Sequence, residues 1–130
     1  MKTTVLPKHQ SWQMGSLLAV TLIFLSSCET KSFNRYGFDC IFEKSSTGLT
    51  LLEVNSNAST ISLTGEVFMD TGEMKVELVD PDGYIVYTRN FFAPGNYFIS
   101  ETFKASHGVW KLRYTSNAGA GTIDLHASFR

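Results

Sequence analysis

From residue 36 onward, apolar and polar side chains alternate with a period of two, which sends neighbouring side chains to opposite faces of a β-sheet. Near the C-terminus, Trp110 and Leu112 share one face while Lys111 and Arg113 share the other. The same alternation recurs along the chain and predicts eight strands. They span residues 36–44, 49–54, 59–69, 73–80, 84–88, 97–103, 108–114 and 122–129.

Turn-forming residues separate these strands. Pro81 presets its φ and Gly83 accepts a positive φ, so strands 73–80 and 84–88 are predicted to form a hairpin. Residues 116–121 contain two glycines and predict a second hairpin with a longer loop. Short strands with frequent turns, and no helical pattern after residue 36, indicate an all-β fold: an antiparallel, jelly-roll-like β-sandwich of about eight strands over residues 36–130, with Trp110 in its core.

The chain begins differently. Lys2 and Lys8 precede an apolar run of 12 residues from Met14 to Leu25. A helix that spans a bilayer needs about 20 apolar residues. A basic start, a short apolar run and small residues after it are the parts of a secretory signal peptide, which we place at residues 1–27.

Leu25-Ser26-Ser27-Cys28 closes this run and resembles the lipobox of bacterial lipoproteins. The resemblance implies that the Cys28 thiol receives a diacylglycerol and that cleavage makes Cys28 the first residue. Acyl chains such as palmitate on Cys28 would then anchor the protein, because two or more chains hold stably at about 0.8 kcal/mol per buried methylene. An ordinary secreted protein with a chance cysteine is the alternative.

This resemblance sets the expected location and the domain boundaries. Glu29 follows Cys28, where an Asp would resemble an inner-membrane retention signal. We therefore expect a lipid-anchored protein at the outer membrane of a bacterial cell envelope. Residues 28–35 are predicted to be the lipidated cysteine and a short tether. Cys40 is then left without a partner and is expected to be a small buried hydrophobic residue, with a reactive or intermolecular thiol as the alternative.

Charge and residue counts limit the ligands. After removal of residues 1–27, nine basic and twelve acidic side chains remain, which argues against nucleic acid. Two histidines and one free cysteine are too few for zinc, and no cofactor is expected. Asp70, Asp80 and Asp82 are weak calcium candidates, although Asp commonly fills turns through hydrogen bonds to nearby backbone.

The candidate binding residues are Phe91, Phe92 and Tyr97. Adjacent residues in a strand point to opposite faces, so one of the two phenylalanines is expected to be exposed. An exposed phenyl ring could stack on a sugar or receive a partner protein. Packing of both rings is the alternative.

Two further segments carry a second resemblance. Val79-Asp-Pro-Asp-Gly83 and Gly108-Val-Trp-Lys-Leu112 are similar to segments of the small jelly-roll modules at the ends of secreted bacterial peptidases. The resemblance covers about the last 60 residues and implies an accessory module without catalytic activity.

The predicted function is a noncatalytic binding or assembly module in the cell envelope, with an envelope protein or a glycan as partner. A carbohydrate-binding accessory of a cell-surface glycan system is the first alternative. A minimal hydrolase that uses His107 or His126 is the second. It is disfavoured because no Gly-x-Ser-x-Gly motif is present, His107 lies in a predicted turn, and His126 lies on an outward strand face.

Overall fold

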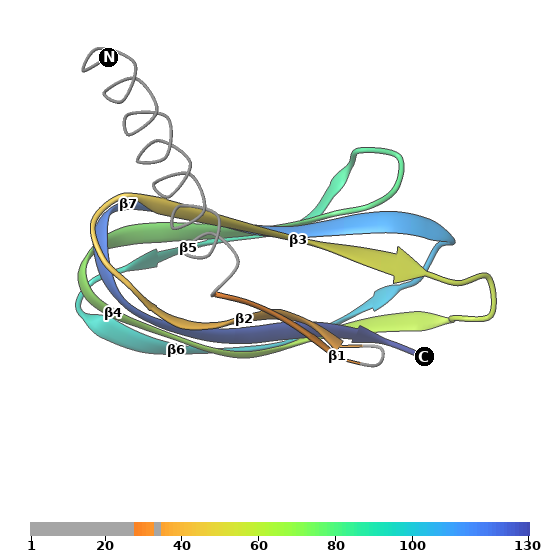
Figure 1. Cartoon of the computed structure of the whole chain (residues 1–130), viewed down its shortest axis with the longest axis horizontal. Helices are drawn as coiled ribbons and strands as arrows, with labels where there is room; N and C mark the ends of the chain where they lie inside the picture. Colours follow the sequence, from red (N-terminus) through yellow and green to blue (C-terminus); the bar gives the residue numbers. More distant parts are fainter. Residues whose placement is uncertain (1–27, 33–34) are drawn as a thin grey trace, which may run out of the picture.

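A computed structural model describes residues 28–32 and 35–130, and within them the chain forms β-strands and no helix (Figure 1). The strands are β1 (Glu29–Ser32), β2 (Arg35–Phe42), β3 (Ser46–Val54), β4 (Thr60–Val79), β5 (Ile85–Phe92), β6 (Gly95–Lys104) and β7 (Gly108–Phe129). This described part contains no helical segment long and apolar enough to cross a membrane. The predicted signal peptide, residues 1–27, lies outside the described residues.

The long strands β4 and β7 organise two layers. They pair with each other in antiparallel fashion along nearly their whole length. Residues 60–69 of β4 also pair with β6, and residues 121–128 of β7 pair with β2, whose other edge holds β1. This five-stranded layer has the order β1-β2-β7-β4-β6.

The other ends of β4 and β7 form a four-stranded layer. There β7 pairs with β3 and β4 pairs with β5, which gives the order β3-β7-β4-β5. Figure 1 shows the two layers facing each other, joined at the left where β4 and β7 bend. The predicted all-β antiparallel sandwich is confirmed.

The hairpin predicted through residues 116–121 is wrong, because the chain bends there instead of reversing. The predicted strands 108–114 and 122–129, one on each side of this bend, merge into β7, and the predicted strands 59–69 and 73–80 merge into β4. Register shifts on either side of Thr71 and positive φ angles of 69° at Gly72 and 52° at Ala118 mark the bend. A Cβ atom on Gly72 would lie 2.3 Å from the Ala118 carbonyl oxygen, so the close approach of the two strands requires glycine there.

The tether predicted at residues 28–35 is also wrong in part. Glu29–Ser32 forms β1, which pairs with β2 from Glu29 opposite Phe38 to Ser32 opposite Arg35. An edge strand leaves a row of backbone N–H and C=O groups unpaired. The short polar strand β1 forms hydrogen bonds with these groups of β2.

A disulfide joins Cys28 to Cys40, with 5.1 Å between their Cα atoms. The expectation that Cys40 is free and without a partner in the chain is therefore wrong in this structure. Antiparallel pairing of β1 with β2 brings the two cysteines together, and that pairing was not predicted. The Cys28 Sγ also lies 3.6 Å from the hydroxyl oxygen of Tyr114.

The core lies between the layers and follows the predicted alternation. Trp110, Leu112 and Tyr114 of β7 point into it. Trp110 is 2% exposed, and its Nε1 donates a hydrogen bond to the Ser106 carbonyl oxygen at 2.9 Å. The indole therefore buries its apolar surface without leaving its N–H unpaired.

Replacing Trp110 with alanine should lower the free energy of unfolding by about 3–5 kcal/mol, because a large buried side chain is lost and a cavity remains. Urea unfolding followed by far-UV circular dichroism measures the change. Leu51→Ala on the outer face of β3 is the control and should change stability by less than about 0.5 kcal/mol. Equal stabilities of the Trp110 variant and the wild type would contradict the buried position.

Candidate functional site

The outer face of the four-stranded layer carries rows of aligned side chains. One row runs straight across all four strands and is entirely polar. Thr47 lies opposite Thr115, Thr115 opposite Lys75, and Lys75 opposite Asn90. Strand register alone brings these residues together, since they come from β3, β7, β4 and β5.

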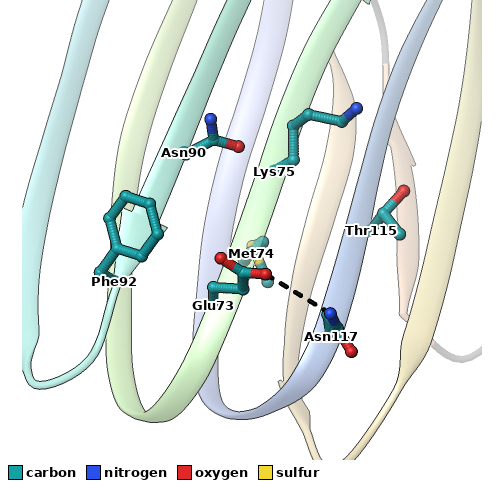
Figure 2. A pocket seen from close by; sticks show the side chains of 7 residues that line it. All are labelled: Glu73, Met74, Lys75, Asn90, Phe92, Thr115 and Asn117. Atoms are coloured by element: carbon teal, nitrogen blue, oxygen red, sulfur yellow. Dashed lines mark hydrogen bonds between the residues drawn. The ribbon is translucent and has the colours of Figure 1, made fainter.

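At the β5 end of this row lies an open hollow of about 360 Å³, which we call the Phe92 hollow (Figure 2). It is lined by Glu73, Met74, Lys75, Asn90, Phe92, Thr115 and Asn117. The Phe92 ring is 55% exposed. Asn117 Nδ2 donates to Glu73 Oε1 at 3.4 Å across the β4–β7 pair, so these two side chains orient each other.

The lining of the Phe92 hollow combines one apolar ring with several short polar groups. Figure 2 shows the Phe92 ring on β5 and the polar ends of Asn90, Glu73, Lys75 and Asn117 around the same space. Two amides, a carboxylate, an ammonium and a hydroxyl supply both donors and acceptors. Such a set can hold a ligand with one apolar face and a rim of hydroxyl groups.

Of the three predicted binding residues, the structure places only Phe92 at this hollow. Phe91 is fully buried, with its ring centroid 5.2 Å from that of Tyr97 and the Arg89 guanidinium 4.9 Å from its centroid. The Tyr97 hydroxyl donates to the Phe92 carbonyl oxygen. Phe91 and Tyr97 therefore support the strand that presents Phe92, as the opposite directions of adjacent side chains require.

The calcium candidates Asp70, Asp80 and Asp82 are not brought together. Asp80 Oδ1 accepts hydrogen bonds from the backbone N–H groups of Asp82 and Tyr84 at 3.0 and 2.9 Å, so it caps the turn between β4 and β5. Asp70 lies at the bend, the other end of this half of β4. Across residues 28–32 and 35–130, no group of three or more His, Cys, Asp or Glu side chains is placed to hold a metal ion.

His126 points outward, as predicted, but it is only 9% exposed, because its ring lies beside Gly37 of β2 and contacts the Thr30 and Arg35 side chains. Its Nε2 lies 3.1 Å from Thr30 Oγ1, and its Nδ1 lies 3.1 Å from Arg35 Nη2 and 3.3 Å from Asp124 Oδ1. Burial lowers the pKa of His126 below its ordinary value, and the Arg35 charge lowers it further, while Asp124 and Asp39 oppose this shift.

These contacts resemble a hydroxyl–imidazole–carboxylate relay, but the proton of the neutral imidazole lies on the nitrogen that would have to accept one. The Arg35 guanidinium can only donate, so in the neutral ring Nδ1 accepts and Nε2 carries the proton. Nε2 therefore donates to Thr30 and has no lone pair with which to activate its hydroxyl. His107 is an exposed residue in the bend before β7. Neither histidine gives support to the hydrolase alternative.

The polar lining residues were missed by sequence reasoning. Glu73 and Lys75 lie at alternate positions of one predicted strand, Thr115 follows another, and Asn117 lies in a predicted loop, at least 40 positions from Lys75 and Glu73. The period-two alternation could have indicated only that Glu73 and Lys75 face outward. The grouping of all four residues depends on strand register, which the sequence pattern does not specify across distant strands.

No protein-family model and no curated protein matches this sequence. Several solved structures share part of its strand arrangement. The insecticidal δ-endotoxin Cry8Ea1 from Bacillus thuringiensis is 14% identical with a TM-score of 0.48, over 72% of this chain and 20% of the toxin. TmCBM61 in complex with β-1,4-galactotriose is 16% identical with a TM-score of 0.48, over 81% of this chain and 77% of that one.

A third example is the C-terminal CBM6 of LamC, a marine laminarinase from Zobellia galactanivorans. It is 15% identical with a TM-score of 0.43, over 72% of this chain and 78% of that one. The chain spans about a fifth of the length of the endotoxin chain. Because these three TM-scores lie below 0.5, we base no functional inference on them.

The lowered pKa of His126 predicts a pH-dependent part of the stability. In the unfolded chain His126 takes up a proton near the ordinary histidine pKa of about 6.5, whereas in the folded protein its pKa is lower. The unfolded state therefore binds more protons below about pH 6.5, and the free energy of unfolding decreases as the pH falls from there toward the folded-state pKa. Urea unfolding at about pH 7.5 and about pH 5 measures the effect. Between these two pH values the free energy of unfolding should decrease more for the wild type than for His126→Gln. Equal decreases would contradict the lowered pKa of His126.

Proposed function

We propose that this protein is a noncatalytic glycan-binding module, with the Phe92 hollow as its binding site. The observation that carries the proposal is that the half-exposed Phe92 ring lines the same hollow as the polar side chains of Asn90, Asn117, Glu73 and Lys75. Pyranose rings have an apolar C–H face and a rim of hydroxyl groups. A phenyl ring can cover the former while amides and charged groups bond to the latter.

The rigidity of the site supports this proposal. Each lining residue of the hollow sits on a strand of the four-stranded layer, and the Tyr97 hydroxyl holds the Phe92 backbone from the other side. Sites built on strands are pre-organised, so little conformational entropy is lost when a ligand binds. A low entropy cost is important for sugar binding, because each sugar hydroxyl group exchanges a hydrogen bond to water for one to the protein, and the net gain is small.

An assembly surface is the second candidate, and a different face favours it. Ile41, Phe68 and Phe98 are exposed on the outer face of the five-stranded layer. Phe68 and Ile41 both lie opposite Thr122 in neighbouring strands, so they share one row. Exposed apolar side chains in one region are typical of protein contacts.

We further propose that the module is exported to the bacterial cell envelope and held at the outer membrane by acyl chains on Cys28. Leu25-Ser26-Ser27-Cys28, with its resemblance to a lipobox, supports this placement. A thioether-linked lipid and the Cys28–Cys40 disulfide require the same sulfur, so they are alternative states. Acylation would draw Cys28 away from Tyr114 and leave Cys40 as a thiol.

Phe92→Ala should weaken binding of the purified protein to its best ligand on an array of soluble oligosaccharides by at least about tenfold. Calorimetric titration gives the affinities. Phe98→Ala is the matched control, because Phe98 is 70% exposed but lies on β6 in the other layer, and this variant should bind like the wild type. Equal affinities of Phe92→Ala and the wild type would reject the Phe92 hollow as the site.

Thiol counting tests the anchor. Protein extracted from bacterial membranes is treated with iodoacetamide without reductant, and its intact mass is measured. The lipidated form should carry one added group, on Cys40, together with the mass of the acyl chains. The Cys40→Ser protein should keep the acyl mass and take up no iodoacetamide-derived group. The Cys28→Ser protein should no longer be found in the membrane fraction. Wild-type protein that takes no group before reduction and two groups after it would contradict acylation.

A further inference from the structure

A second hollow lies beside the Phe92 hollow on the outer face of the four-stranded layer. It has a volume of about 450 Å³, and we call it the Lys111 hollow. It is lined by Thr47, Gly48, Leu49, Lys111, Arg113, Tyr114 and Thr115. Thr115 lines both hollows, so they are adjacent parts of one surface.

The strand register gives the length of this combined surface. The polar row from Thr47 through Thr115 and Lys75 to Asn90 runs from one hollow into the other. It crosses three inter-strand steps of about 4.8 Å each, or roughly 14 Å in total. That distance exceeds one pyranose ring, so a ligand that occupies both hollows is an oligomer lying across the strands.

The charges of the two hollows differ. The Phe92 hollow contains Glu73 and Lys75, one charge of each sign. The Lys111 hollow contains Lys111 and Arg113 and no acidic residue. Its lining is therefore cationic, although the chain as a whole carries a formal net charge of −1.

One carboxylate, that of Glu77, compensates part of this charge. Arg113 Nε donates to Glu77 Oε1 at 2.9 Å, and Lys75 Nζ lies 4.0 Å from the same oxygen. Two cations thus share one nearly buried carboxylate. Within residues 28–32 and 35–130, Lys111 takes part in no ion pair, and Arg113 uses only its Nε in a hydrogen bond.

We propose that the Lys111 hollow is a second subsite that binds a carboxylate or sulfate group of an extended acidic glycan, whose apolar ring face lies on Phe92. This inference rests on the proposed function and names its ligand class. The Lys111 ammonium and the Arg113 Nη groups supply charge-assisted hydrogen bonds to the anion. Exposed Leu49 provides the apolar contact for the sugar ring that carries it.

The overall charge of the protein sharpens this preference. An acidic protein repels an anionic ligand over most of its surface, and a local cationic hollow then directs the ligand to one place. Exposed charge pairs weaken as salt screens them. Binding of the acidic glycan should therefore decrease with ionic strength, while contact with Phe92 should not.

The test uses paired oligosaccharides of equal length on the full protein. Oligogalacturonate is compared with its methyl ester, and a sulfated oligosaccharide with its desulfated form. In at least one pair the acidic member should bind the wild type at least about tenfold more tightly, as expected for a charge-assisted contact. The pair that shows the preference identifies the anion as carboxylate or sulfate. No preference in either pair would overturn the inference.

The variants locate the preference. Lys111→Gln should abolish it by weakening the acidic ligand alone, whereas Lys104→Gln, an exposed lysine on β6 of the other layer, should keep it. Phe92→Ala should weaken the acidic and neutral members equally. If Lys111→Gln still prefers the acidic ligand as strongly as the wild type does, the second subsite is rejected, and the proposed glycan binding is not affected. Unchanged binding in Phe92→Ala would instead reject the Phe92 hollow as the binding site and, with it, a single ligand spanning both hollows.

Discussion

Antiparallel pairing between β4 and β7 is the contact on which the rest of the structure depends. The ladder runs from Ile61 opposite Phe129 to Val79 opposite Lys111, and both strands bend together so that one pair contributes to two layers. β2, β3, β5 and β6 each join one edge of this pair. The register of the central pair therefore fixes which β4 and β7 side chains align on each outer face, including Lys75 and Thr115 at the centre of the row that joins the two hollows.

The sequence predicted what depends on local alternation. Period-two patterns identified the inward faces of β4 and β7, and Trp110 is buried as expected. What the sequence could not predict depends on distant partners. The bend in β7 is an example: residues 115–120 pair with residues 71–75 of β4, and Ser116 donates a hydrogen bond to the Lys44 carbonyl oxygen, 72 positions away. Glycine-containing stretches favour a bend and a reversal equally.

The same distinction applies to the candidate site. Opposite directions of adjacent side chains predicted that either Phe91 or Phe92 would be exposed, and the structure assigns that position to Phe92. Its polar neighbours lie on three different strands and were indistinguishable from ordinary solvated residues. β1 was missed for a related reason: a short polar segment has little strand propensity of its own and is ordered by β2 and the disulfide.

The placement of β1 has a mechanical consequence. β1 belongs to the five-stranded layer, whereas both hollows open on the four-stranded layer. If a lipid holds the chain at Cys28, a force on a bound polymer acts on the four-stranded layer and is transmitted to the lipid through the five-stranded layer. β4 and β7 are the strands common to both, so this load passes along their covalent backbones and loads the ladder between them in shear. With both proposals in place, a module that bound its ligand on one layer and was tethered through the other would resist pulling without separation of its layers.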